Sequence, residues 1–128
     1  MPLYIVNSKP GSVAQAAKEK IAADITRIHC DVTGAPPSFV HVLVTEDNGD
    51  HLPDNLTGIV NGTIRAGRTG TQKAEIAERI SAALAATADV DPSTVSTTTR
   101  DIEASFTMEG GVVLPEPGSD EEAAWMTT

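Results

Sequence analysis

The chain has 128 residues, of which 40% are hydrophobic and only 3% aromatic, and its net charge is −9. This length allows one domain with a core of Ala, Val, Ile and Leu. The excess of acidic over basic residues disfavours nucleic acids and anionic membranes as partners, because both bind a basic face of a protein. No apolar run reaches the roughly 18 residues of a membrane span. With no signal segment and only one cysteine, the sequence predicts a cytoplasmic protein without an internal disulfide.

The first part of the chain has the pattern of strand, helix and strand. Residues 2–8 predict a short buried strand. A capping box at Ser12 and Gln15 predicts the start of a long helix, which Gly34 and the following prolines end. Its apolar stripe contains Val13, Ala17, Ile21, Ile25 and Ile28. Residues 39–45 are apolar almost throughout and predict a strand buried on both faces.

The same order of elements then repeats after a polar loop over residues 46–55. Residues 56–64, 71–87 and 94–100 predict a strand, a helix and a strand. A shift of about 55 positions pairs the two helical stripes and the strands after them, which indicates two copies of one β-α-β unit.

These patterns predict an α/β fold with a single domain. Its units cover about residues 2–46 and 56–101, and a tail over 103–128 carries a Gly110-Gly111 turn and a capped helix from Ser119. Two such units give a four-stranded mixed sheet with two helices on one face. The other face needs a cover, so we expect oligomerisation.

Pro2 is the first candidate for chemistry. Initiator Met1 is commonly removed before a small residue, and removal would leave a secondary amine at Pro2. An α-amino group has a pKa of about 8 and can therefore act as an acid or a base near neutral pH. A proline that simply begins the first strand is the alternative.

Further polar candidates follow the predicted elements. His29 lies on the buried stripe near the helix end, where the dipole favours a cationic imidazole, although a core histidine with a satisfied hydrogen bond is the more common case. Arg65 and Arg68 follow the third strand and could clamp one carboxylate, or could be solvated surface residues. Glu109 precedes the glycine turn and reads as an exposed carboxylate. The sequence offers no set of three or four metal ligands, and we expect no cofactor.

The order of several short motifs resembles the cis-3-chloroacrylic acid dehalogenase family of the tautomerase superfamily, from end to end. The motifs are Pro2-x-Tyr4, Ile25-Thr26-x-x-His29, Thr33-Gly34, Arg65-x-Gly67-Arg68, Glu109-x-Gly111, Leu114-Pro115-x-Pro117-Gly118 and Ser119-Asp120-Glu121.

The resemblance implies a role for each matching residue. Pro2, once Met1 is removed, would transfer a proton at a substrate carbon. His29, Arg65 and Arg68 would bind and polarise the substrate carboxylate, and Glu109 would help to activate water. The resemblance also implies a homotrimer.

Thr98 stands where the family has a tyrosine that activates water. Threonine is shorter and its hydroxyl is far less acidic than a phenol. We therefore expect tautomerase-type isomerisation of a small 2-oxo or α,β-unsaturated carboxylate, or slow hydration, rather than efficient hydrolytic dehalogenation of 3-haloacrylates. The alternative is a non-catalytic trimeric scaffold that binds carboxylates.

Overall fold

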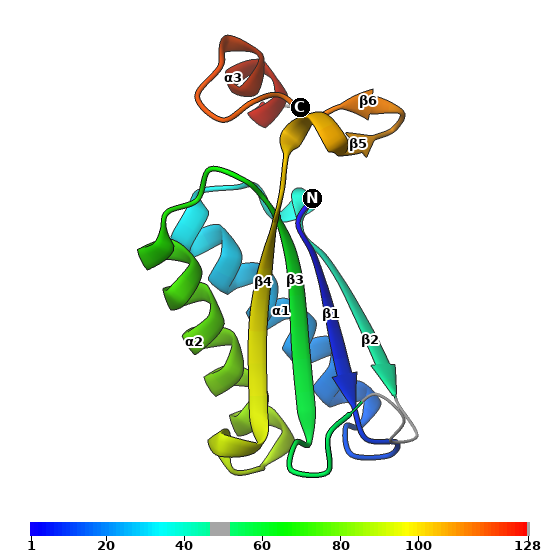
Figure 1. Ribbon diagram of the computed structural model, residues 1–128. Coiled ribbons are helices and arrows are strands. Elements are labelled where there is room, and N and C mark those ends of the chain that lie inside the picture. Colours follow the sequence, from blue (N-terminus) through cyan, green and yellow to red (C-terminus); the bar gives the residue numbers. More distant parts are fainter. Residues whose placement is uncertain (47–51, 128) are drawn as a thin grey trace.

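The computed structural model describes residues 1–46 and 52–127, and Figure 1 shows its elements. The first unit contains strand β1 (Leu3–Ser8), helix α1 (Gln15–Thr33) and strand β2 (His41–Glu46). The second contains strand β3 (Gly58–Arg65), helix α2 (Gly70–Ala88) and strand β4 (Val95–Ile102). The tail contains the short strands β5 (Met108–Glu109) and β6 (Val112–Val113) and helix α3 (Asp120–Met126). The predicted loop over 46–55 falls partly on residues 47–51, which lie outside the described residues.

The four long strands form one mixed sheet in the order β2-β1-β3-β4. Each unit pairs its own strands in parallel, β1 with β2 and β3 with β4, and the two units meet through antiparallel pairing of β1 with β3. Both long helices cover the same face of this sheet (Figure 1). The predicted α/β fold of two β-α-β units is therefore confirmed.

The core lies between the sheet and the two helices. The alternation along β1 turns Tyr4, Val6 and Ser8 toward the helices. The predicted stripe supplies the helical side through residues at helical spacing on α1 and their counterparts on α2. The buried members are Val13, Ile21, Ile25, Ile28, Ile76, Ile80 and Leu84.

The start of α1 differs from the prediction. The Ser12 hydroxyl donates to the Lys9 carbonyl at 2.6 Å and so serves a turn, and α1 begins after Ala14 without a side-chain cap. The predicted capping box at Ser12 is therefore wrong. A complete capping box is found instead at α2, between Thr69 and Gln72.

Strand β2 is not buried on both faces, which corrects a second prediction. It is an edge strand, and the helices cover only one face of it, so Leu43 on the other face is 51% exposed. Phe39 belongs to a single 3-10 turn before the strand, where its ring is buried. A continuous apolar run shows only that both faces of a strand can be buried against other elements. In the described part of this chain, Leu43 on the second face of β2 stays exposed.

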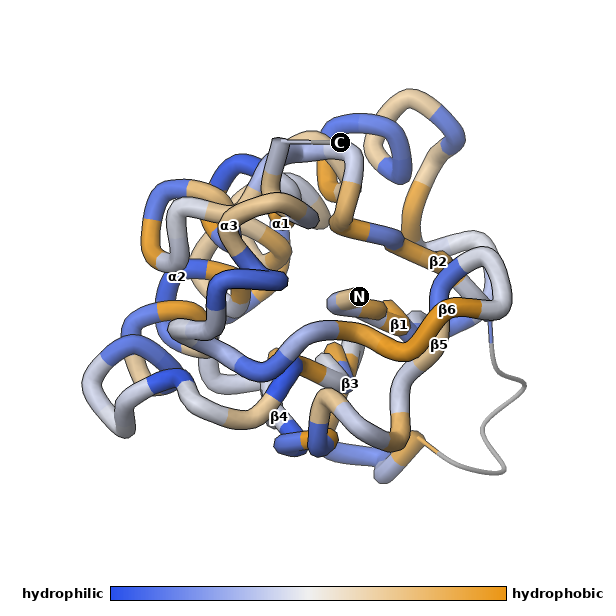
Figure 2. Tube along the Cα trace, turned by 90° about the horizontal axis from the view of Figure 1, so that it is seen from above, coloured by the Kyte–Doolittle hydropathy of each residue, from blue (hydrophilic) through white to orange (hydrophobic). Residues whose placement is uncertain are grey.

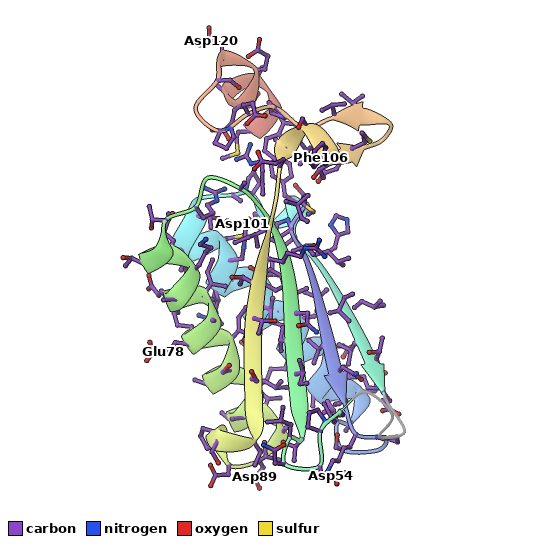
Figure 3. The ribbon with its side chains drawn as sticks, viewed as in Figure 1. Asp54, Glu78, Asp89, Asp101, Phe106 and Asp120 are labelled. Atoms are coloured by element: carbon purple, nitrogen blue, oxygen red, sulfur yellow. The ribbon has the colours of Figure 1, made fainter. Side chains whose placement is uncertain are left out.

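The tail crosses over the end of the sheet at which β1 begins and β3 and β4 end (Figure 1). Seen from above, the N-terminus lies amid α3, the β5–β6 hairpin and the strand ends (Figure 2). The predicted cap of α3 is confirmed, since the Ser119 side chain accepts the Glu122 backbone N–H. Acidic side chains such as Asp120 and Glu78 project outward from the surface (Figure 3).

Gly67 fixes how closely the tail approaches the loop between β3 and α2. Its φ is +115°, and a Cβ there would lie 2.9 Å from Cγ of Pro117. Only glycine permits both this backbone conformation and this contact. The loop that carries the two arginines is thereby packed directly against the tail.

Candidate active site

The candidate site lies beneath the tail, at the end of the sheet where β1 begins. His29 comes from the C-terminal part of α1, Arg65 from the last position of β3, and Arg68 from the loop before α2. Together with the N-terminus they line a small cavity of about 10 Å³. Its lining residues are Met1, Pro2, His29, Ala35, Phe39, Arg65, Arg68, Trp125 and Met126. Four residues predicted from separate parts of the sequence thus share one cavity.

The contacts of Met1 bear directly on the chemistry expected of Pro2. The Met1 amine donates to the Phe39 carbonyl at 3.2 Å and forms an ion pair with the Glu109 carboxylate. While Met1 is attached, the Pro2 nitrogen is an amide nitrogen and has no basic lone pair. Met1 is among the residues that line the cavity, which holds no more than about one water molecule.

His29 is bonded to Tyr4 across the core. The Tyr4 hydroxyl and His29 Nδ1 lie 2.7 Å apart, and the two side chains are at most 2% exposed. Burial, followed by the charges of Arg68 and the N-terminal amine, lowers the pKa of His29 to about 4. Of the two interpretations of His29, the contact with Tyr4 and the lowered pKa favour the neutral, hydrogen-bonded core histidine, because burial outweighs the helix dipole. Burial also raises the pKa of Tyr4, so its hydroxyl keeps its proton.

Arg65 is a buried cation that the tail surrounds. One guanidinium nitrogen donates to the Pro115 carbonyl at 2.9 Å, and another forms an ion pair with Glu122. The guanidinium carbon lies 5.2 Å from the centre of the Trp125 ring. That ring stacks on Phe39 with centroids 4.1 Å apart. Arg65 is thus neither a solvated surface residue nor, in this state, open to an external anion.

Arg68 is the more accessible of the two guanidiniums. It is half-buried, and its one hydrogen bond in the described part of the chain is a long one of 3.5 Å to the Thr33 carbonyl. Burial and the neighbouring charge of Arg65 lower its pKa, but a guanidinium remains charged at any physiological pH. A carboxylate entering the cavity would meet this cation first.

Glu109 and Thr98 lie in different surroundings. Glu109 reaches the N-terminal amine from β5, so the structure brings it to the edge of the site. Thr98 does not line the cavity. Thr97 bonds Ser81 of α2, so Thr98 points to the opposite, open face of the sheet, where it donates to Asn61 at 2.6 Å.

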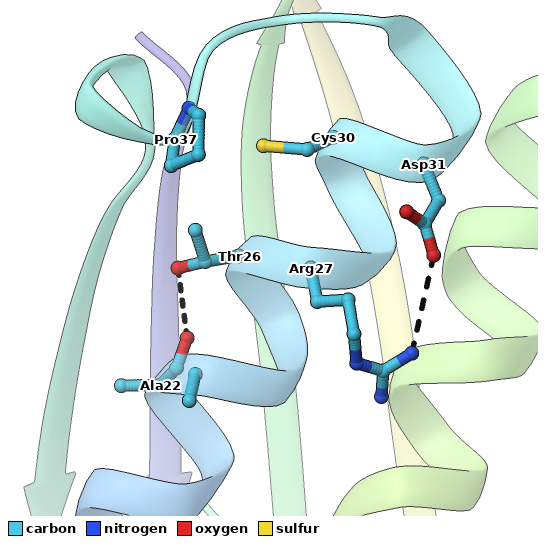
Figure 4. Close-up of a pocket in the computed structure, with 7 residues that line it drawn as sticks. Ala22, Thr26, Arg27, Cys30, Asp31 and Pro37 are labelled. Atoms are coloured by element: carbon cyan, nitrogen blue, oxygen red, sulfur yellow. Dashed lines mark hydrogen bonds and ion pairs between the residues drawn. The ribbon is translucent and has the colours of Figure 1, made fainter.

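A larger hollow, of about 590 Å³, lies on the outer side of α1, as Figure 4 shows. It is an open groove between α1 and Pro37, and its polar groups are already paired: Thr26 bonds the Ala22 carbonyl and Arg27 reaches Asp31. Burial and the charge of Asp31 raise the pKa of the Cys30 thiol, which disfavours a reactive thiolate. The candidate site residues therefore line the small cavity and not this groove.

Two further findings concern metal binding and membrane spanning by the described residues. Among them, no group of three or more His, Cys, Asp and Glu side chains is arranged to bind a metal ion. The helices of the same residues include none that is long and apolar enough to span a membrane.

Three residues next to the site were missed by the sequence interpretation. Tyr4 was noted only as part of a motif, and Glu122 only as part of a helix cap. Trp125 could have been found, because it is the one tryptophan in a chain poor in aromatic residues and lies three positions after Glu122. That spacing places both on one face of α3.

Comparison with known proteins connects this geometry to a family. The family model Tautomerase_3, described as "Putative oxalocrotonate tautomerase enzyme", matches residues 1–128. A search of curated proteins finds no match to the chain.

Several solved structures are similar to this chain. The crystal structure of N1, a member of the cis-3-chloroacrylic acid dehalogenase family, is 28% identical with a TM-score of 0.86, over 98% of this chain and 91% of that one. Native Ps01740 is 33% identical with a TM-score of 0.77, over 84% and 99%. A fused 4-OT wild-type asymmetric trimer, 24% identical with a TM-score of 0.77 over 87% and 94%, shares the fold.

Proposed function

Because the chain belongs to the tautomerase superfamily and resembles its cis-3-chloroacrylic acid dehalogenase family, we propose that it uses a Pro2 amine to move a proton on a small carboxylate. The substrate class is a 2-oxo acid or its enol, or an α,β-unsaturated acid. The amine forms when Met1 is removed.

One observation carries this proposal: the N-terminus, a neutral histidine and two guanidiniums line the same cavity. Arg68 offers a half-buried positive charge to a carboxylate, and the two cations together would stabilise the enediolate-like species formed during proton transfer. Without Met1, the Glu109 carboxylate would lose its present ion-pair partner and could face a substrate.

In the enol-to-keto direction, the prolinium nitrogen of Pro2 delivers a proton to the carbon next to the enol, and the C=C electron pair forms the new C–H bond. The enol hydroxyl gives its proton to solvent as the carbonyl forms, and the Pro2 amine takes a proton from solvent. The prolinium is thereby restored, and the reaction is a balanced isomerisation. Neutral His29 lines the cavity and can polarise the substrate oxygen, while the buried Tyr4 hydroxyl holds the imidazole through Nδ1.

Two features favour isomerisation over hydrolytic dehalogenation. Addition of water requires a group that orients and activates it, and Glu109 alone lies at the edge of the site. Thr98 lies on the open face of the sheet, bonded to Asn61. Within one chain it is not positioned to assist Glu109, which supports tautomerase-type chemistry as the main activity and slow hydration as a side reaction.

The proposal is tested by the enol-to-keto conversion of an aryl 2-oxo acid. The wild-type chain should accelerate the reaction, and Pro2→Ala, whose primary amine is less basic and lacks the ring, should lower kcat/KM by about 100-fold or more, the usual contribution of general acid–base catalysis. Arg27→Ala, a change on the outer side of α1, is the control and should leave the rate unaltered.

Equal rates for Pro2→Ala and the wild type would remove Pro2 from the mechanism. The absence of any conversion by the wild type, with carboxylate binding intact, would favour the non-catalytic carboxylate-binding scaffold instead.

A further inference from the structure

Glu122 lies next to the candidate site. It is a carboxylate of the tail that reaches into the arginine cluster, and none of the proposed steps uses it. Its Oε1 accepts the Gly118 backbone N–H at 3.0 Å, while its buried Oε2 faces the Arg65 guanidinium in an ion pair. The side chain is only 20% exposed.

Glu122 occupies the position beside Arg65 at which the carboxylate of a substrate would be expected to bind. Burial opposes the charged form of Glu122, but its pKa is lowered by the hydrogen bond from the Gly118 backbone N–H, by the hydrogen bond and charge of Arg65, and by the charge of Arg68. Glu122 therefore lies in the field of both cations. A buried guanidinium can bind a second carboxylate only where one of its N–H groups is still free to donate. On Arg65 one nitrogen already serves Pro115 and another serves Glu122.

The same contact holds the tail on the site. Glu122 and Trp125 lie on one face of α3, and both touch Arg65, the first through its charge and the second through its ring. Trp125 and Met126 also line the cavity. If Glu122 leaves Arg65, α3 loses this ion pair, and Trp125, which keeps its stacking on Phe39, is held less tightly.

We infer that Glu122 is a specificity-determining residue, an internal carboxylate that a substrate carboxylate displaces from Arg65. The inference rests on the proposed function, since it concerns the substrate group of that same site. A carboxylate would bind first to Arg68 and then exchange with Glu122 on Arg65, and α3 would loosen as it does so. A neutral ligand of the same shape has no charge with which to drive this exchange.

The chain contains a built-in reporter for this exchange, because Trp125 is its only tryptophan. The test measures quenching of its fluorescence by acrylamide during titration with propanoate, a small unreactive monocarboxylate. We expect propanoate to increase quenching in the wild type, and propanamide, which is neutral and of similar shape, to have no effect.

The matched variants are Glu122→Gln and Glu121→Gln. Both remove one negative charge from α3, but Glu121 is exposed. Glu122→Gln should bind propanoate about tenfold more tightly than the wild type, a typical coupling between two groups that compete for one site. Glu121→Gln should bind like the wild type. Circular dichroism and thermal unfolding confirm that each variant is folded.

Unchanged Trp125 quenching on saturation of the wild type with propanoate overturns the inference, whatever the variants do. Equal affinity of Glu122→Gln and the wild type overturns it as well. Failure of the proposed function is seen separately, as absence of enol-to-keto conversion by a wild-type chain in which the exchange still takes place.

Discussion

At the scale of single residues, charge and burial together decide what each side chain of the site can do. Arg65 and Arg68 both stay charged, yet Glu122, Pro115 and Trp125 already engage the first, while the second keeps most of its donors free. His29, which helix position alone would favour as a cation, is neutral because it is buried next to a cation. The cavity is thus lined by two cations and a neutral histidine, and the buried Tyr4 holds that histidine in place.

The neutral state of His29 predicts a pH dependence of stability. The pKa of His29 falls from 6.5 to about 4 on folding, so the unfolded chain binds a proton that the folded chain does not bind between these values. The free energy of unfolding should therefore decrease as the pH falls from about 6.5 to about 4, by up to ~1.4 kcal/mol per pH unit from this group.

Urea unfolding at pH 7 and pH 5 checks this expectation. His29→Gln should lose about 2 kcal/mol less than the wild type between these pH values. His41→Gln, at an exposed histidine on β2, should keep the wild-type difference. The same pH dependence in His29→Gln as in the wild type would contradict the neutral, buried imidazole.

At the scale of the elements, β1 and β3 support the site through a close contact between a ring and a glycine. Tyr4 and Gly62 are antiparallel partners, and the Tyr4 ring lies over the glycine. A Cβ at position 62 would lie 2.5 Å from the ring carbon Cε1. This contact holds the ring whose hydroxyl bonds His29. The antiparallel pairing of the two units therefore helps to position the site.

Gly62→Ala should consequently destabilise the fold. The added methyl group must push the fully buried Tyr4 ring aside, and overpacking of this kind costs about 2–3 kcal/mol. Gly70→Ala is the control: a Cβ there meets nothing within 4 Å, so we expect little change or a small gain. Equal stabilities of the two variants in urea unfolding would show that the Tyr4 ring moves aside without a cost in stability, which would contradict this prediction.

The sequence predicted the elements well because each carries its own local pattern. The apolar stripes over the residues of α1 and α2 predicted the two helices. The repeated β-α-β unit predicted the two parallel strand pairs. The exposed face of β2 and the cap of α1 depend on neighbours and on turn geometry, which a local pattern does not contain. Pro2, His29, Arg65 and Arg68 could be predicted to share a site, whereas the ion pair between Arg65 and Glu122 could not, since it depends on how the tail folds back.

At the scale of the whole molecule, apolar side chains remain on the face of the sheet opposite the helices and on the tail hairpin. Leu43 of β2 is 51% exposed. In the tail, Phe106 is 77% exposed and Val112 69%, and Figure 2 shows the hairpin as a mostly apolar strip. Such surfaces on one small chain indicate an interface. We therefore expect this chain to associate with further copies of itself.

Light scattering of the full chain should give three times the protomer mass of 13.3 kDa. Leu43→Asp, which introduces a charge at the exposed edge of the sheet, should weaken the trimer. Ala86→Asp, on the exposed side of α2, should leave it intact. A monomer in the wild type at micromolar concentration would contradict the trimer and leave the apolar surface without an explanation.

The central claim is that the working chain carries a free secondary amine at Pro2 inside this cavity. Nitrogen NMR of the uniformly ¹⁵N-labelled native protein, titrated with pH, tests it most directly. We predict a proline amine nitrogen whose signal titrates, as an α-amino group does around its usual pKa of about 8, in a chain whose intact mass lacks Met1. A Pro2 nitrogen that remains an amide and does not titrate, with Met1 retained, would contradict the claim.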